Sequence, residues 1–230
     1  MIAELINVSK QYPGAEALRN LSLSIPKGQI VGLMGPNGAG KTTLLKLLAG
    51  LARPTRGEVR VEGRTPDRLA KARIAYAPDS DHLYPWMTVG ETLAFMRPFF
   101  ADWDQERAAT LAEFMALPAR QRVSQLSRGM RARLRLVLTM ARSAPLILLD
   151  EPLSGIDVPS RSRIVEAILG QFQPEQQTLI LSTHDVMETE ALFDRLILLE
   201  AGQVKLDDTA DALRNQYGKS VRDLLEEVYR

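Results

Sequence analysis

The chain has 230 residues and a formal net charge of +1, and 45% of its residues are hydrophobic while 25% are charged. These values are ordinary for a soluble globular domain with a substantial core, and the balanced charge argues neither for nor against nucleic-acid or membrane binding. The absence of cysteine excludes disulfides and cysteine-ligated metal sites. No signal peptide or membrane-spanning stretch is evident, so we expect a chain that does not itself cross a bilayer.

Predicted strands and helices alternate along the chain. An apolar run at 28–34 ends in a glycine loop, and the leucines that follow it predict a helix. Further patterns predict strands at 57–63, 73–78, 146–150 and 178–182, helices at 161–171 and from about 186, a hairpin at 195–208 and an amphipathic helix at 219–230. This alternation predicts an α/β fold with a largely parallel sheet covered by helices.

Residues from about 88 to 142 interrupt the alternation with helical patterns rich in Ala, Leu, Met and Glu. Asp102 and Asp104 are candidate helix starts, and another helix is predicted after Ser127. We interpret the stretch as a helical subdomain inserted into the core of a single domain that spans 1–230.

The sequence GPNGAGKTT, which begins at Gly35, fits the phosphate-loop pattern. Its glycines let backbone N–H groups face a bound oxyanion, and the N-terminus of the next helix adds positive partial charge. Lys41 is predicted to reach the β- and γ-phosphates of ATP, and the Thr42 hydroxyl to ligate Mg²⁺. A plain glycine-rich turn is disfavoured by the position between a strand and a helix. The predicted ATP-binding residues of the loop are Gly35, Pro36, Asn37, Gly38, Ala39, Gly40, Lys41, Thr42 and Thr43.

Two carboxylates, Asp150 and Glu151, end the buried run LILLD. An ionised carboxylate is costly to bury unless a cation or a hydrogen-bond donor meets it. In phosphate-loop NTPases an acid at this place holds the magnesium ion, and we assign that role to Asp150. Glu151 is the predicted general base for the attacking water. Taken alone, LLDEP could also be a strand that meets a turn.

With LSRGM at 126–130, the chain resembles the ATP-binding cassette (ABC) ATPases, the nucleotide-binding subunits of ABC transporters, over nearly its whole length. The resemblance implies the phosphate-loop NTPase fold of that family, with a mostly parallel RecA-like core sheet, an antiparallel β-subdomain and the inserted helical subdomain. It implies adenine stacking on Tyr12, γ-phosphate contacts from the signature residues Ser127 and Gly129, a D-loop that contains Asp157, and catalytic roles for Lys41, Glu151 and the switch histidine His184. The alternatives are an ordinary half-buried aromatic at Tyr12, a structural role for His184 and a simple N-cap at Ser127.

The same resemblance implies a head-to-tail dimer with ATP and Mg²⁺ between one subunit's phosphate loop and the other's signature motif. ATP binding would close this dimer, and hydrolysis would open it. The expected function is ATP hydrolysis that energises transport, with export favoured, through a separate transmembrane permease subunit at the cytoplasmic face of the membrane. A homodimer is favoured because this chain holds every part of a site, and a heterodimer is the alternative.

Other functions fit less well. A soluble cassette ATPase that acts on ribosomes or DNA is the second reading, and a small-molecule kinase would leave Ser127, Asp157 and His184 unexplained. Arginines recur through 120–142, but without interleaved aromatics for base stacking, so nucleic-acid binding is disfavoured.

Three features depart from the family's commoner pattern or extend it. Asp79 stands where the family has a glutamine, and an ionised aspartate accepts hydrogen bonds but cannot donate them. We expect Asp79 to sense the magnesium ion; the alternative is a turn cap. Arg128 and Met130 replace the commoner glycine and glutamine of the signature motif. An aromatic pair, Tyr84 and Trp86, lies where the family docks its membrane subunit, unless both rings pack inside.

Overall fold

The structure is a computed structural model that describes residues 1–184 and 192–217. The helix predicted from about 186 begins outside the described residues, and the amphipathic helix predicted at 219–230 lies wholly outside them. Within the described residues no helix combines the length and the apolar character that crossing a bilayer requires. The described chain ends in a helix that we did not predict, α7 (Ala210–Tyr217).

The centre of the molecule is a six-stranded sheet in the order β5-β6-β7-β3-β8-β9. Its bounds are β5 (Ile74–Ala77), β6 (Leu146–Asp150), β7 (Thr178–Thr183), β3 (Ile30–Met34), β8 (Arg195–Glu200) and β9 (Gln203–Thr209). All neighbouring pairs are parallel except β8 and β9, which form the predicted hairpin. Every residue of β3, β6 and β7 is buried, as expected for parallel strands covered on both faces.

A second, antiparallel sheet has the order β2-β1-β4. It consists of β1 (Ala3–Tyr12), β2 (Ala15–Ile25) and β4 (Arg56–Val61). The buried leucines of α1 (Lys41–Leu48) belong to one apolar cluster with residues of both sheets, which include Leu5, Ile25 and Leu33. The predicted α/β class, with a mostly parallel core sheet and an antiparallel sheet, is therefore confirmed.

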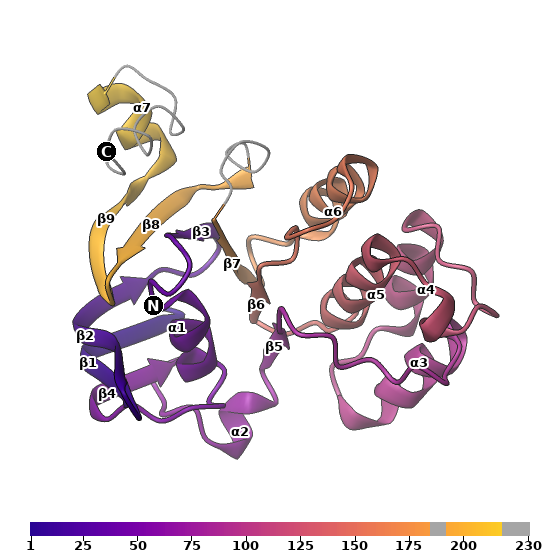
Figure 1. Ribbon diagram of the computed structural model, residues 1–230, viewed down its shortest axis with the longest axis horizontal. Helices are drawn as coiled ribbons and strands as arrows, with labels where there is room; N and C mark the ends of the chain where they lie inside the picture. Colours follow the sequence, from indigo (N-terminus) through magenta and orange to yellow (C-terminus); the bar gives the residue numbers. More distant parts are fainter. Residues whose placement is uncertain (185–191, 218–230) are drawn as a thin grey trace.

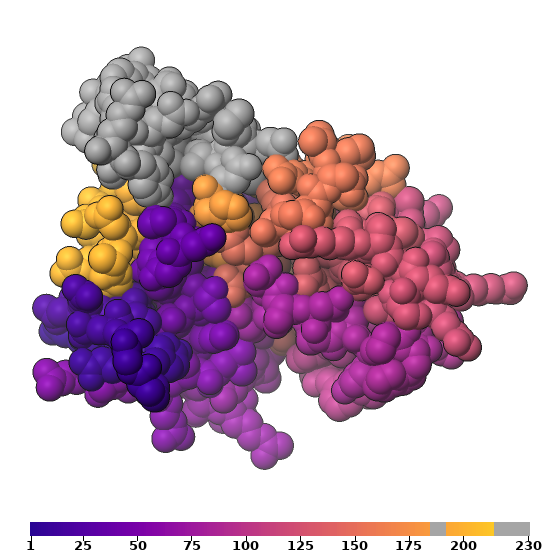
Figure 2. Space-filling model, viewed as in Figure 1, coloured from indigo at the N-terminus to yellow at the C-terminus, as the bar shows by residue number. Residues whose placement is uncertain are grey.

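Most remaining helices lie on the far side of β5 from the hairpin (Figure 1). They are α3 (Val89–Met96), the short helix η1 (Arg97–Phe99), α4 (Gln105–Phe114), η2 (Val123–Gln125) and α5 (Arg128–Met140), while α6 (Val158–Gln171) packs on α5 and α2 (Arg68–Lys71) precedes β5. Figure 2 shows residues of this stretch as a lobe at one end of the molecule. Its interpretation as an inserted subdomain stays a prediction.

Two predicted helix starts in this lobe are confirmed. Asp104 accepts a hydrogen bond from the N–H of Arg107, and Ser127 accepts one from the N–H of Met130, so each caps its helix. Asp102 does not cap a helix. Its carboxylate instead pairs with the buried guanidinium of Arg142, with Nε 3.0 Å from Oδ1. Arg142 also donates to the carbonyl of Ile74, so its buried guanidinium links the segment that follows α5 to β5.

Candidate nucleotide site

The glycine loop between β3 and α1 is shaped by its surroundings. Gly35 and Gly40 have φ values of 149° and 107°, a region that favours glycine. A Cβ on Gly35 would lie 2.3 Å from the carbonyl oxygen of Leu199, and one on Gly40 would lie 2.6 Å from that of Ala17. The carbonyl of Ala39 accepts a hydrogen bond from Gly202 N–H. Close packing against β8, β2 and the hairpin turn therefore holds the loop in position.

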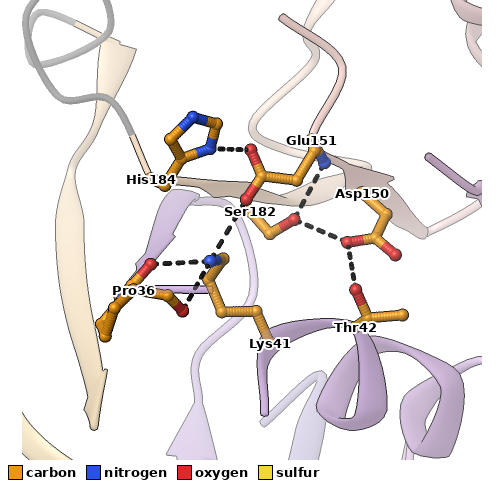
Figure 3. A network of polar contacts seen from close by, with 8 residues as sticks. Pro36, Lys41, Thr42, Asp150, Glu151, Ser182 and His184 are labelled. Atoms are coloured by element: carbon orange, nitrogen blue, oxygen red, sulfur yellow. Dashed lines mark hydrogen bonds and ion pairs between the residues drawn. The ribbon is translucent and has the colours of Figure 1, made fainter. Parts of the chain in front are cut away.

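Lys41, the first residue of α1, points back into this loop (Figure 3). Its side chain is only 6% exposed, and its Nζ donates to the carbonyls of Gly35 at 2.6 Å and Pro36 at 3.3 Å. The same Nζ lies 3.2 Å from Glu151 Oε1. That contact is an ion pair without hydrogen-bond alignment, and Oε1 is a buried atom without a hydrogen-bond partner among the described residues. The ammonium of Lys41 and the carboxylate of Glu151 thus offset each other's charge.

Asp150, at the end of β6, is 2% exposed and is surrounded by hydroxyl groups. It accepts hydrogen bonds from Thr42 Oγ1 at 3.1 Å, Ser182 Oγ at 2.8 Å and Tyr76 Oη at 3.2 Å. Burial, and then the negative charge of Asp150, raise the pKa of Tyr76, so this phenol stays protonated and keeps donating. Donors on β5, β7 and α1 therefore compensate for the burial of the carboxylate.

Glu151 follows directly but points to a different place. Its φ of 48° turns the chain, and its N–H donates to Ser182 Oγ at 2.9 Å. Its carboxylate, on a side chain 12% exposed, lies between Lys41 and His184, whose Nδ1 is 2.8 Å from Oε2. Two neighbouring acids thus face two different sets of partners.

Ser182 and Tyr76 were missed in the sequence analysis. Ser182 could have been found from the sequence, because the predicted strands 146–150 and 178–182 end at Asp150 and Ser182. If the two strands are parallel neighbours, these last residues lie side by side, and this pairing is observed. Tyr76 carried no such signal, since a tyrosine on an edge strand is ordinary.

A cavity of about 320 Å³ opens over the loop. It is lined by Ala17, the loop residues 37–43, Asp79 and Glu151, so the structure brings Asp79 together with Lys41 and Glu151. Tyr12 does not line this cavity; it lies exposed at the end of β1, with Lys10 Nζ 4.8 Å from the ring centroid. The signature residues and Asp157 do not line it either.

Those signature residues lie where the N-termini of α5 and α6 meet. Gly129 is buried, and a Cβ there would lie 2.6 Å from both Asp157 Oδ1 and Ser160 Oγ. Asp157 caps α6 by accepting from Ser160 N–H at 3.0 Å, and the hydrogen bonds from Ser160 lower the pKa of Asp157. Two helix N-termini, which bear positive partial charge, therefore stand side by side.

The chemistry of the cavity fits a nucleotide with a divalent cation. The loop offers N–H groups, a helix N-terminus and one ammonium for phosphates. Thr42 and Asp150 are hard oxygen ligands, which suit Mg²⁺. No cluster of three or more His, Cys, Asp or Glu residues that could hold a metal occurs among the described residues. Mg²⁺ usually takes one or two protein ligands and completes its coordination with water and substrate phosphates.

Known proteins resemble this chain in sequence and structure. The family model described as ABC transporter matches residues 18–154. The chain is 35% identical over 225 residues to Nod factor export ATP-binding protein I of Bradyrhizobium diazoefficiens, covering 94% of this chain and 73% of that protein. It is 36% identical over 216 residues to the aliphatic sulfonates import ATP-binding protein SsuB of Escherichia coli, covering 94% and 84%. A solved dimeric structure of the ATP-binding cassette MJ0796, in a post-hydrolysis state bound to ADP and Pi, aligns with a TM-score of 0.80 at 26% identity, covering 90% of this chain and 98% of that one.

Proposed function

Because this chain belongs to the ABC transporter family, as an ATP-binding subunit that hydrolyses ATP to energise transport, we propose that Lys41, Thr42, Asp150 and Glu151 carry out its reaction. The observation that carries this assignment is that Lys41, Thr42 and Glu151 line one cavity. Asp150 accepts a hydrogen bond from Thr42, and His184 contacts Glu151, so all five side chains form one contact network (Figure 3). The reaction converts ATP and water to ADP and phosphate.

Each residue has a role that follows from its contacts. The loop N–H groups bind the phosphates, and Lys41 exchanges its carbonyl and carboxylate partners for phosphate oxygens. Thr42 and Asp150 would hold Mg²⁺, whose charge would offset that of the β- and γ-phosphates. Glu151 accepts the proton of the attacking water. His184, in contact with the Glu151 carboxylate, orients it and reaches the γ-phosphate. For Tyr12, which lies outside the cavity, adenine stacking is the role that the family resemblance implies.

The site is completed by a second subunit. Ser127 and Gly129 lie outside the cavity of their own chain, so in the family arrangement they contact the γ-phosphate held by the partner, with Asp157 at the interface. The dimeric relative bound to ADP and Pi supports this arrangement. ATP contacts both subunits only in the closed dimer. ATP binding therefore favours the closed dimer, and hydrolysis lets the two subunits separate. A homodimer is favoured, because one chain supplies both halves of a site.

An exposed aromatic cluster, Tyr84, Trp86, Phe95 and Phe99, supplies a surface for the membrane subunit. Trp86 is 64% exposed, so the alternative that both predicted rings pack inside is wrong. The ring centroids of neighbours in the cluster are 4.9 to 5.5 Å apart, which makes one continuous apolar surface. Such surfaces mark protein interfaces. We place the chain at the cytoplasmic face of a membrane, docked through this cluster on a separate permease, and we favour export because relatives such as the Nod factor protein are named for it.

Affinity purification of the tagged chain with its chromosomal neighbours tests this function. We expect a polytopic membrane protein to co-purify and Trp86→Ala, in this exposed cluster, to weaken its retention. Co-purification of ribosomes or DNA instead of a membrane protein would support the soluble alternative.

Specific ATPase activity of the isolated chain should rise with protein concentration as dimers form, and a concentration-independent rate would contradict the shared site.

Asp79 is the departure whose effect is most directly measurable. Asp79 lines the cavity, and its carboxylate caps no backbone N–H among the described residues. The neighbouring turn is capped by Asp81, which accepts from Leu83 N–H. Replacing Asp79 by glutamine removes one negative charge near the predicted metal ligands. Because one partly exposed charge pair contributes up to about 1 kcal/mol, the half-saturating Mg²⁺ concentration for ATPase should rise about two- to fivefold. Glu58→Gln, a remote exposed charge change, is the control. Superimposable Mg²⁺ titrations of Asp79→Gln and parent would remove Asp79 from the metal site.

A further inference from the structure

The segment that leaves the nucleotide cavity is held by two arginines of α5. Arg135 Nη1 donates to the carbonyl of Asp79 at 2.7 Å, and Arg131 Nε lies 3.0 Å from Asp81 Oδ2. Positions 131 and 135 are four apart and therefore share one face of the helix. Burial lowers the pKa of Arg135, while the carboxylates of Asp81 and Asp79 oppose this shift. The whole turn from Asp79 to Asp81 is thus fixed to α5.

Arg131 has a second acceptor at the start of the same helix. Its Nη1 donates to the carbonyl of Leu126 at 2.9 Å, and Leu126 directly precedes the capping serine, Ser127. A guanidinium can bind two acceptors at once because its donors form a rigid planar fork, which an ammonium group lacks. One side chain therefore joins the Asp81 turn to the signature motif.

Three functional parts meet at this arginine pair. The Asp79 end of the turn lines the nucleotide cavity together with Thr42 and Glu151. Its other end runs into Tyr84 and Trp86 of the exposed aromatic cluster. The bridged carbonyl of Leu126 lies at the helix end that presents Ser127. These arginines also occupy positions that no proposed catalytic or phosphate-binding role accounts for.

We propose that Arg131 and Arg135 are positioning residues, which make the signature motif of a subunit follow the state of that subunit's own nucleotide cavity. The proposal rests on the shared dimeric site of the proposed function. A shift of Asp79 when nucleotide binds moves Asp81, and through Arg131 it moves Leu126 and Ser127, which complete the partner's site. The two ATP sites of the dimer are thereby linked through each protomer.

Coupling of this kind is measured by a double-mutant cycle on the ATPase reaction. The variants are Arg131→Gln, Asp81→Asn and the two together, with kcat, KM and the nucleotide affinity of dilute protein determined for each. We expect each single change to lower kcat about five- to tenfold, by analogy with couplings of that size between linked sites. Nucleotide affinity should stay within about twofold, because the phosphate loop is untouched. The double variant should be no slower than Arg131→Gln, since both changes break one bridge.

Two further variants separate positioning from charge and from general stability. Arg131→Lys keeps the charge but lacks the fork, so it should be nearly as slow as Arg131→Gln. Arg60→Gln breaks the exposed Arg60–Glu58 pair on β4, away from the cavity, and should leave kcat unchanged. Thermal unfolding is recorded for all variants. Asp81→Asn lies in an exposed turn and carries the test if a helix variant does not fold.

An unchanged kcat for Asp81→Asn, or purely additive effects in the double variant, would overturn the proposal. Full activity of Arg131→Lys would show that charge alone acts there and would overturn the bridging role. These results differ from failure of the proposed function, in which the unmodified chain itself would show no ATPase activity or none that depends on its concentration.

Discussion

Glu151→Gln is expected to lower the rate of ATP turnover about 10²- to 10⁴-fold, the usual contribution of a general base. An amide has the shape of the carboxylate but does not accept the proton of the attacking water. It also loses the charge that pairs with Lys41 at 3.2 Å, so Lys41 becomes freer to bind phosphate. ATP affinity should therefore be retained or increased, and the ATP-bound dimer should accumulate.

Steady-state ATPase assays and light scattering after size exclusion with ATP measure the two halves of this prediction. Glu166→Gln, an exposed position on α6, is the matched control and should behave as the parent does. Hydrolysis by Glu151→Gln at the parental rate would show that another group activates the water.

Lys41→Ala should instead impair nucleotide binding itself. Hydrogen bonds to charged groups contribute about 1.5–3 kcal/mol, so the Kd for ATP should rise about 10- to 150-fold. The ammonium is buried and bonded to the loop carbonyls of Gly35 and Pro36. Lys41 is also the one lysine or arginine among the described residues that line the cavity, so no other lining cation replaces it.

Titration with a fluorescent ATP analogue measures this effect. Lys46→Ala is a matched control on the same helix, because Lys46 is exposed and does not line the cavity. An unchanged Kd for Lys41→Ala would contradict the phosphate-binding role of the loop.

Local motifs predicted the centre of the molecule better than its periphery. The glycine loop between a strand and a helix, the acids that end β6 and the hairpin at 195–208 were all predicted from short patterns and are found, and the hairpin turns at Ala201–Gly202. Each of these depends on backbone conformation within a few residues, which sequence patterns record well.

The long strands β1 and β2 were not recognised from their pattern. Their pairing contains register shifts near Val8 and Lys10, and Asn7 and Asn20 have positive φ. Such irregularities break the period-two alternation by which a strand is recognised. The antiparallel sheet was expected only through the family resemblance.

Contacts between distant segments were also beyond local patterns. Asp102 resembles a helix cap in sequence, but it pairs with Arg142, 40 positions away. The hydroxyl of Tyr76 reaches Asp150 from 74 positions away. Only the packed fold determines which of several possible partners a polar side chain meets.

The crowding around Gly129 affects which signature-motif variants are informative. Even an alanine there would lie too close to Asp157 and Ser160 at the start of α6. Loss of activity in a Gly129 variant could therefore result from distorted packing between α5 and α6 as readily as from a missing phosphate contact. Ser127 is exposed and has room for change, so its replacement by glycine, which costs little as an N-cap, isolates the hydroxyl's contribution to hydrolysis.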